Sequence, residues 1–382
     1  MKNILNFLGK NDITEPPWDY DFLRNLDEKE YPKYLAKLFY LNTGEKLPLS
    51  HGVIDKKKLK TFNQKIQYFK LYGVTDLMRN CTDKVKVRDY VKERIGEEYL
   101  KPVLQIIGAC HSENVENQNV NSVDFQVVQN LKKELKEEKM LKHACINDEI
   151  QNEKINKTAV QHDRPLIDFI PKSTDVSTYF DLINWDKLPN AFVIKCNHGC
   201  KWQYIIKDKN RFLQNKRLFE IVKQNITGWL EQDYSFWGGF EMQYRKIKPK
   251  ILIEPLMRDE MNNNSQNIQF YCFSGNPKVI LKLYGNNTET IYDENFNRIN
   301  KIFASCDKYI SIDADNNIKQ SFYLTSKLSL DFMFVRVDWM LYKNKLYFEE
   351  LTFTPYSGFH KFKDYKHGLF YGDFINLERQ KI

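Results

Sequence analysis

FVRVDWMLYKNKLYFEELTFTP, the sequence of residues 334–355, consists of two apolar and aromatic runs on either side of a short polar turn, Lys343–Lys345. Runs rich in β-branched and aromatic residues predict β-strands, so this segment is expected to form a β-hairpin. If the hairpin is centred on Asn344, residues that lie opposite each other have numbers that sum to twice 344. The register of the two strands follows from this rule.

Four polar side chains then share one face of the hairpin. Asp338 lies opposite Glu350 and Arg336 lies opposite Thr352, because residues two apart in a strand point to the same side. Opposed Cβ atoms are about 5 Å apart, and like charges there are destabilising. Two such carboxylates need a cation, and Mg²⁺ commonly binds one or two carboxylates together with substrate phosphates. The Arg336 guanidinium can hold a transferring phosphoryl group. Alternatively, the face is exposed and its charges are solvated or paired with one another.

A second informative segment, residues 188–208, reads as strand, loop and strand. Lys195 stands at the end of an apolar strand, where a charge is costly unless it meets a partner. The loop that follows, Asn197-His198-Gly199, can fold over nucleotide phosphates and offer backbone N–H groups, while the lysine neutralises their charge. The alternative is an ordinary hairpin with a lysine that reaches solvent.

A third segment, residues 249–257, is an apolar strand that ends in Glu254. Its end can present backbone groups to the edge of an adenine ring, although a buried strand with a glutamate at its edge explains the pattern equally well. Helical periodicity predicts helices in residues 20–100 and again at 216–230. Further strands are expected at 191–196, 204–206, 268–273 and 278–284. Helices first and a mostly antiparallel sheet later indicate an α+β protein.

Composition excludes several classes of protein. The formal net charge is +8, but basic and acidic residues are interspersed along the chain, so no nucleic-acid or membrane partner is expected. Seven scattered cysteines do not predict a disulfide framework, and Cys196 and Cys200 beside His198 lack the further ligands of a zinc site. Neither a secretory signal nor a run of about 18 apolar residues is found, so a cytoplasmic protein is expected. Residues 111–175 are polar and predict an insertion or arm with one helix at 131–141.

Several blocks together resemble the TupA-like (teichuronopeptide biosynthesis) ATP-grasp family of surface-polysaccharide proteins, over approximately residues 30–110 and 180–380. The blocks are TFNQKIQYFKLY (61–72), DKVKVRDYVKERIGEEYL (83–100), LPNAFVIKCNHG (188–199), ILIEPL (251–256), VRVD (335–338), ELTFTP (350–355) and GLFYGDFINL (368–377). The resemblance implies two α+β lobes that grip ATP, preceded by a helical region. The expected limits are 1–110 for the helical region, 111–179 for the arm and 180–382 for the ATP-grasp domain. Within that domain, 188–285 is the nucleotide lobe and 286–382 the metal lobe.

The resemblance also implies roles for the candidate residues. Mg²⁺ is expected on Asp338, Glu350 and Thr352, with Arg336 steadying the transferred group. At the ATP phosphates, the expected contacts are Lys195 and the loop residues Asn197, His198, Gly199 and Lys201, with Lys282 as a weaker one. Glu254 and Leu256 are expected at the adenine, and Glu260 at the ribose.

The chain departs from the family pattern at three places. The loop reads His198-Gly199-Cys200-Lys201 where His-Gly-Ser-Gly is common, so its phosphate contacts are in doubt. Thr352 stands where many ATP-grasp ligases have an asparagine ligand, and its hydroxyl binds metal more weakly. In the strand that ends in Glu254, Pro255 stands where the family pattern has a second glutamate.

The expected activity is ATP-dependent ligation of a carboxylate to an amine through an acyl phosphate. By the resemblance, the carboxylate belongs to a hexuronic acid of a capsule or cell-surface polysaccharide. One alternative is a nucleotide-sugar glycosyltransferase that uses Asp313 and Asp315, a DxD pair. Another is a nucleotide-binding protein without catalysis.

Overall fold

The computed structural model describes residues 20–108, 167–169, 175–257, 266–284, 288–300, 302–303, 308–309 and 314–378. All of these residues belong to one compact unit. Most of the expected arm, 111–179, lies outside the described residues, including its helix at 131–141, but residues 167–169 and 175–179 are described. Glu260 and Asp313 also lie outside the described residues.

The helical N-terminal region consists of short helices, as the sequence predicts. They are α1 (Tyr20–Arg24), α2 (Tyr31–Thr43), α3 (Phe62–Tyr72), α4 (Asp76–Thr82) and α5 (Val87–Ile95), with a small hairpin of β1 (Leu49–Ser50) and β2 (Val53–Ile54) after α2. Thr61 caps α3 and exchanges hydrogen bonds with Gln64 in a capping box. Residues 83–95 lie within the region predicted to be helical, but α5 begins only at Val87, because Asp83 ends α4 and its carboxylate accepts the N–H of Val85 at 2.9 Å.

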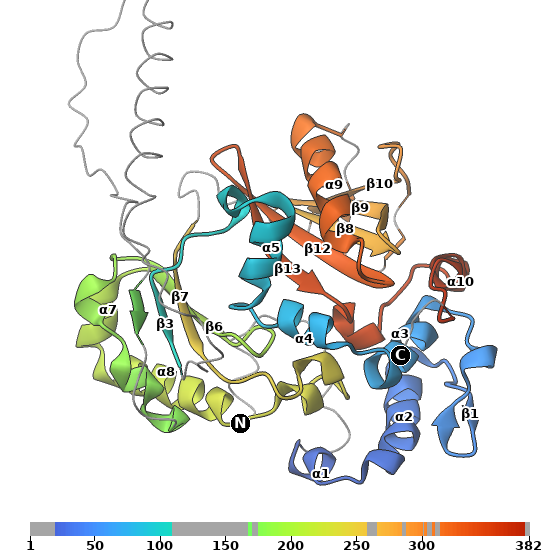
Figure 1. Cartoon of the computed structure of the whole chain (residues 1–382), viewed down its shortest axis with the longest axis horizontal. Coiled ribbons are helices and arrows are strands. Elements are labelled where there is room, and N and C mark those ends of the chain that lie inside the picture. The colour runs from blue at the N-terminus through green and yellow to red at the C-terminus, as the bar shows by residue number, and fades with distance from the viewer. Residues whose placement is uncertain are drawn as a thin grey trace, which may run out of the picture. The chain divides into compact units, whose positions relative to one another are not determined.

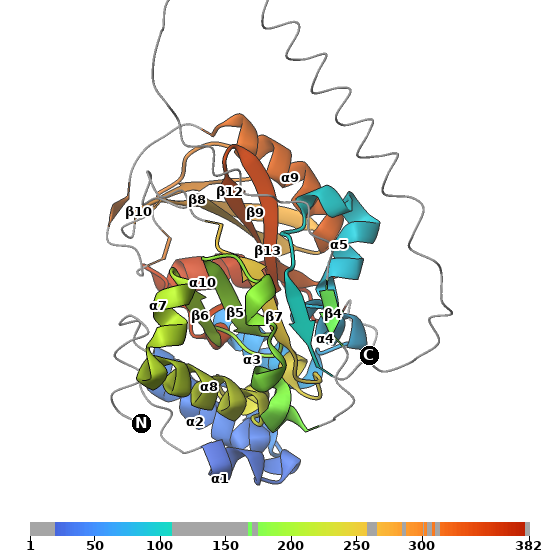
Figure 2. The ribbon, with the colours of Figure 1, turned by 90° about the vertical axis from the view of Figure 1, so that its left-hand side faces the viewer.

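A five-stranded sheet carries the second and third informative segments. Its order is β4 (Ile167–Phe169), β3 (Gln105–Ile107), β7 (Ile251–Pro255), β5 (Phe192–Cys196) and β6 (Gln203–Ile206), and only β3 and β4 run parallel. One face packs against α8 (Lys216–Leu230), with α7 (Lys209–Gln214) alongside, as Figure 2 shows. Because side chains alternate along a strand, Lys195 and Glu254 point away from this core.

A six-stranded sheet carries the polar hairpin. Its order is β11 (Lys308–Tyr309), β10 (Thr288–Tyr292), β9 (Asn276–Tyr284), β8 (Gln266–Phe273), β12 (Phe334–Tyr342) and β13 (Lys345–Thr352). One face packs against α5 and α9 (Asn316–Ser329), and α9 lies along the sheet in Figure 1. The other face packs against α2, α3 and α10 (Tyr365–Asp373). The fold class is therefore α+β, as expected.

The hairpin register is as expected at the pairs Asp338–Glu350 and Arg336–Thr352, but it is shifted by one residue nearer the turn. The turn has two residues, Lys343 and Asn344, both with positive φ (49° and 59°), as a type I′ turn requires. A two-residue turn alone would shift Asp338 to the position opposite Glu349. A β-bulge leaves Glu349 unpaired between two cross-strand pairs and restores Asp338 opposite Glu350.

The expected lobe limits do not coincide with the sheets. Strands β8 and β9 belong to the same sheet as β12 and β13, so residue 285 does not divide one sheet from the other. The first sheet also takes β3 from the segment assigned to the helical region. Among the described helices, none has both the length and the apolar character needed to span a bilayer.

Candidate functional site

Arg336 is the centre of the polar face on the hairpin. Its guanidinium donates to both carboxylate oxygens of Asp338 at 2.7 Å, to Glu350 Oε1 at 2.9 Å and to Thr352 Oγ1 at 3.2 Å. The Thr352 hydroxyl also donates to Glu350 Oε1 at 2.7 Å, and Gln269 of β8 donates to Asp338 at 3.1 Å. The four side chains predicted to share a face therefore form one hydrogen-bonded cluster.

The environment of the cluster shifts its carboxyl groups in opposite directions. Burial raises the pKa of Asp338 to about 7, with Arg336 opposing the rise and Glu350 adding to it. Partial burial also disfavours the ionised form of Glu350, but Arg336 and the Thr352 hydroxyl outweigh it and lower the pKa of Glu350. The two acidic groups are therefore not equivalent, and a cation beside both would favour the ionised form of each.

The five-stranded sheet presents a second charged group. Lys195 on β5 donates to Glu254 Oε2 on β7 at 2.6 Å, and both side chains are largely buried. Burial alone would raise the pKa of Glu254, yet Lys195 and Lys101 outweigh it and lower this pKa to about 2. The ammonium group of Lys195 also interacts electrostatically with Glu349 and Glu350, so this pair and the hairpin cluster lie close to each other.

Two residues of the loop after β5 have buried side chains that anchor the loop. The Asn197 amide donates to Asp83 Oδ1 at 2.9 Å and to the Lys248 carbonyl at 3.0 Å, while its oxygen accepts the N–H of Lys250 at 2.6 Å. The His198 ring lies 3.1 Å from the Trp229 carbonyl. Burial lowers the pKa of His198 to about 4. Both side chains fix the shape of the loop and do not point freely toward a nucleotide.

Gly199 and Lys201 are the residues that give the loop its path. A Cβ on Gly199 would lie 2.3 Å from the Trp202 ring, so only glycine fits this close approach. Lys201 is exposed and has a φ of 60°. Of the predicted loop residues, Lys201 alone has a side chain that is exposed and charged. The backbone carbonyl of Gly199 accepts a hydrogen bond from a lysine of another segment.

That lysine, Lys84, is a basic residue near the site that the sequence did not single out, and Lys101 is another. The ammonium of Lys84 donates to the Gly199 carbonyl, and burial lowers its pKa despite the nearby Glu350. Lys101 lies between the two sheets, 2.7 Å from Glu349 Oε2 and 3.8 Å from Glu254 Oε2. Lys84 stands in a block that carries the resemblance, and this was its only signal in the sequence.

Leu256 and Lys282 are both predicted to contact the nucleotide, but only Leu256 lies near the other candidate residues. The Leu256 N–H donates to the Ala191 carbonyl at 3.3 Å, next to the end of β7, so it lies beside Glu254. Lys282 lies on the opposite face of the six-stranded sheet from Arg336, where it pairs with Asp315 at the start of α9. The structure therefore does not bring Lys282 to the cluster. Side chains alternate along β9, and it is the neighbouring Leu281 that points to the same face of the sheet as Arg336.

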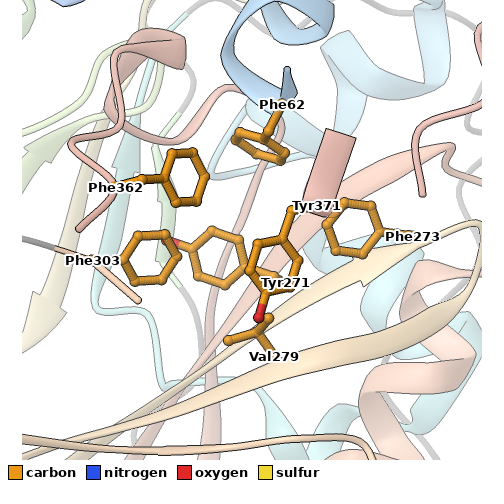
Figure 3. Close-up of a pocket in the computed structure, with 7 residues that line it drawn as sticks. All are labelled: Phe62, Tyr271, Phe273, Val279, Phe303, Phe362 and Tyr371. Carbon is orange, nitrogen blue, oxygen red and sulfur yellow. The ribbon is translucent and has the colours of Figure 1, made fainter. Parts of the chain in front are cut away.

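A small pocket also lies on the Arg336 side of the sheet. Figure 3 shows it, with its aromatic rings gathered above Val279. Its lining comes from Phe62, Tyr271, Phe273, Val279, Phe303, Phe362 and Tyr371. Tyr271 is the cross-strand partner of Arg336. Since the lining is otherwise apolar, the pocket is a gap in the core beside the polar cluster.

The hairpin residues fit a magnesium ion. Asp338, Glu350 and Thr352 offer only oxygen atoms, the type of ligand that Mg²⁺ prefers, and Mg²⁺ typically takes one or two carboxylates and completes its shell with phosphates and water. No group of three or more His, Cys, Asp or Glu residues in the described part of the chain could hold a metal ion. The donor set thus suits a metal ion shared with substrate phosphates and not a closed structural site.

Comparison with known proteins identifies the family of the chain. Residues 126–376 match the family described as TupA-like ATPgrasp. No curated protein matches the chain. Among solved structures, D-alanine–D-alanine ligase from Bacillus anthracis complexed with ATP is 16% identical, with a TM-score of 0.24 over 44% of this chain and 40% of that one. The Helicobacter pylori enzyme is 14% identical, with a TM-score of 0.28 over 53% of each chain. The ATP-grasp ligase PsnB with a minimal precursor is 10% identical, with a TM-score of 0.21 over 43% and 40%. The chain matches about half the length of these structures, and the assignment rests on the family match.

Proposed function

Because the chain belongs to the TupA-like ATP-grasp family, we propose that it is an ATP-dependent ligase that joins a carboxylate to an amine. The observation that carries the proposal is the Arg336 cluster, in which one guanidinium holds Asp338 and Glu350 beside the Lys195–Glu254 pair. Basic groups and paired carboxylates suit phosphoryl transfer, where positioning and charge neutralisation supply most of the catalysis. A serine or cysteine nucleophile is not required.

In the proposed reaction, a carboxylate oxygen of the substrate attacks the γ-phosphorus of ATP. The bond from phosphorus to the β,γ-bridging oxygen breaks, and ADP leaves with that electron pair. The amine nitrogen then attacks the acyl carbon of the acyl phosphate, phosphate leaves, and the nitrogen loses a proton to give the amide. Lys195 and Lys84 would neutralise the ATP phosphates, and Arg336 would steady the transferred group.

Asp338, Glu350 and Thr352 would hold Mg²⁺, which supplies charge neutralisation at the phosphates when bound. Lys195 would exchange its present partner, Glu254, for a phosphate oxygen. Glu254, with the backbone at Leu256, would then be available to the adenine. The loop 197–201 would cover the phosphates through its backbone, since the Asn197 and His198 side chains are already engaged. Water would be kept from the acyl phosphate in this way.

The family assignment also supports a substrate class. We propose a hexuronic acid of a capsule or cell-surface polysaccharide as the carboxylate and an amino acid or amino alcohol as the amine. The reaction would take place in the cytoplasm, where ATP is available.

An assay of ADP release tests this proposal. Purified protein with Mg²⁺, ATP and glucuronate or galacturonate should release ADP when an amine is added, and hydroxylamine in place of the amine should trap the acyl phosphate as a hydroxamate. Arg336→Lys should lower the rate at least about tenfold, because a lysine cannot make the paired contacts of a guanidinium. ATP binding without ADP release, for every uronic acid and amine tried, would instead favour a nucleotide-binding protein without catalysis.

The glycosyltransferase alternative has less support. Asp315 caps α9, accepting the Ile318 N–H at 3.0 Å, and pairs with Lys282. Its carboxylate therefore has a structural role on the face away from Arg336. Tight binding of a UDP-sugar that depended on Asp315 and not on Lys195 would revive this alternative.

A further inference from the structure

Lys70 of α3 is a fully buried lysine in the core beside the hairpin. Its ammonium donates to Gln67 Oε1 at 3.0 Å, to the Ser357 carbonyl at 3.0 Å and to Ser357 Oγ at 2.9 Å. The ammonium also lies 4.8 Å from the centre of the Phe359 ring. Burial lowers the pKa of Lys70 to about 7, although nearby Glu241 opposes the change. Burying such a group is costly, and no step of the proposed reaction uses it.

Glu241 is the buried acidic group electrostatically coupled to Lys70. Its Oε1 accepts a hydrogen bond from the Thr354 hydroxyl, and Thr354 in turn accepts one from Gln243 Nε2 at 2.6 Å. Burial raises the pKa of Glu241, and Lys70 opposes the rise. Only 6% of Glu241 and 3% of Thr354 is exposed. The two buried charges therefore act on two ends of the same short segment, Thr354–Gly358.

That segment has an unusual backbone. Tyr356, Ser357 and Gly358 have consecutive positive φ values of 51°, 54° and 70°. Non-glycine residues in this region cost free energy and persist only where their surroundings hold them. Here Gln67 donates to the Gly358 carbonyl at 2.9 Å, and Ser357 Oγ donates to the Gly238 carbonyl. A Cβ on Gly358 would lie 2.4 Å from Gln67 Nε2.

The segment also continues the row of candidate metal ligands. Glu350 and Thr352 share a face of β13, and Thr354 follows two residues after Thr352, the last residue of the strand. Thr352 donates to Glu350 at 2.7 Å, and Thr354 donates to Glu241. The end of this row is thus fixed from outside the hairpin, by α3 and by the segment around Glu241.

We propose that Lys70 and Glu241 are positioning residues that hold the Thr354–Gly358 segment and so align Glu350 and Thr352 for the metal ion. This inference rests on the proposed function, because it assigns a task to residues that act through the metal ligands. In this proposal the N-terminal helical region also supports the site, because Lys70 of α3 contacts Ser357, almost 290 residues later in the sequence.

Binding of Mn²⁺, followed by electron paramagnetic resonance with ATP present, tests the proposal without knowledge of the carboxylate or the amine. Lys70→Met keeps most of the side-chain volume and removes all three hydrogen bonds. We expect it to weaken Mn²⁺ binding at least about tenfold and to leave ATP affinity measured in EDTA within about twofold. Lys65→Met is the matched control. Lys65 lies on the same helix and also donates to two carbonyls, those of Gly372 and Ile375, but these belong to the end of α10.

A second comparison separates positioning from simple stabilisation. In Lys70→Met, Glu241 is left as a buried acid without its counter-charge. Adding Glu241→Gln should restore much of the lost resistance to urea, but it should not restore Mn²⁺ affinity, since the contacts to Ser357 are still missing. If Lys70→Met does not fold, Ser357→Ala replaces it, with an expected loss of about threefold in Mn²⁺ affinity.

The outcomes are distinct. Wild-type Mn²⁺ affinity in folded Lys70→Met, or in folded Ser357→Ala where Lys70→Met does not fold, would overturn the positioning role. An equal loss in Lys65→Met would do the same. Failure of the wild type to bind ATP and Mn²⁺ together would overturn the proposed function, and the inference would fall with it.

Discussion

At the scale of single residues, the site is a set of charges that satisfy one another. Lys195 is paired with Glu254 at 2.6 Å, and Arg336 with Asp338 and Glu350. Buried charges are tolerated only when they are paired, so each of these groups needs either its present partner or a ligand. We propose that the ion pairs hold the side chains in place until a nucleotide and a metal ion exchange with them.

Glu254→Gln should change how stability depends on pH. The lowered pKa of Glu254, about 2, means that the native state binds this proton less readily than the unfolded chain does. Ionised Glu254 therefore stabilises the protein above about pH 4.5, by about 3 kcal/mol, and this contribution is lost as pH falls toward 2. Urea unfolding at pH 7, 4.5 and 3 should show a gap between wild type and Glu254→Gln that narrows in acid. A pH-independent gap would contradict the ion pair, and exposed Glu220→Gln is the control.

The sequence predicts most of the site at this scale, and its omissions have a physical reason. That Arg336 and Asp338 share a face, and that Glu350 and Thr352 do, follows from strand alternation, but the pairing of one strand with the other depends also on the register. Lys84 and Lys101 lie in segments far from the hairpin, and nothing local marks a lysine whose partner is a distant carbonyl or carboxylate. The resemblance implies a phosphate contact for Lys282, yet the side of a strand on which a residue lies depends on what covers each face.

At the scale of elements, the hairpin depends on a bulge that alternation cannot reveal. Lys343 and Asn344 form the turn and Glu349 is the extra residue. The predicted turn is one residue too long, and the predicted strand pairing lacks the bulge, which adds one residue. These two errors cancel at the pair Asp338–Glu350. Helix α9 was missed for a related reason. It buries Ser321 and Thr325 together with its apolar residues, and Thr325 accepts a hydrogen bond from the Trp339 indole at 2.7 Å, so its apolar periodicity is interrupted.

Changing the turn residues should stabilise the hairpin without affecting ATP binding. Lys343→Asn with Asn344→Gly places the preferred type I′ residues where φ is already positive, and we expect a gain of about 1 kcal/mol in the free energy of unfolding. Urea denaturation measures the gain. A loss of stability would mean that the turn has another conformation.

The loop after β5 should be sensitive to a single methyl group. Gly199→Ala would place a Cβ 2.3 Å from the Trp202 ring, whose neighbours include Trp229 and His198. We expect a loss of about 1–3 kcal/mol in stability from the displaced ring and weaker ATP binding from the altered loop. Gly228→Ala in α8 is the control, because its Cβ meets nothing within 4 Å and should add about 0.5–1 kcal/mol. Unchanged ATP affinity in folded Gly199→Ala would remove the loop from the phosphate site.

At the scale of the whole molecule, two sheets contribute one charged surface each to the candidate site. The five-stranded sheet carries Lys195 and Glu254, and the six-stranded sheet carries the Arg336 cluster, with Lys101 in contact with Glu349 between them. The α+β class and most strands follow from the sequence. The grouping of strands into sheets does not, because β3 and β4 are three residues long and their partners are distant in the chain.

The proposed function requires a magnesium-dependent ATP site between Lys195 and the Asp338–Glu350 pair, and calorimetric titration with ATP measures whether this site exists. Wild type, Lys195→Met, Glu350→Gln and Lys209→Met would be compared with Mg²⁺ and with EDTA. Lys209 is the control, because it donates to the Trp185 and Leu188 carbonyls in place of a carboxylate. We expect metal-dependent binding that falls at least about tenfold in Lys195→Met and Glu350→Gln, and not in Lys209→Met. Equal ATP affinity in wild type and Lys195→Met, or no ATP binding by the wild type, would contradict the account.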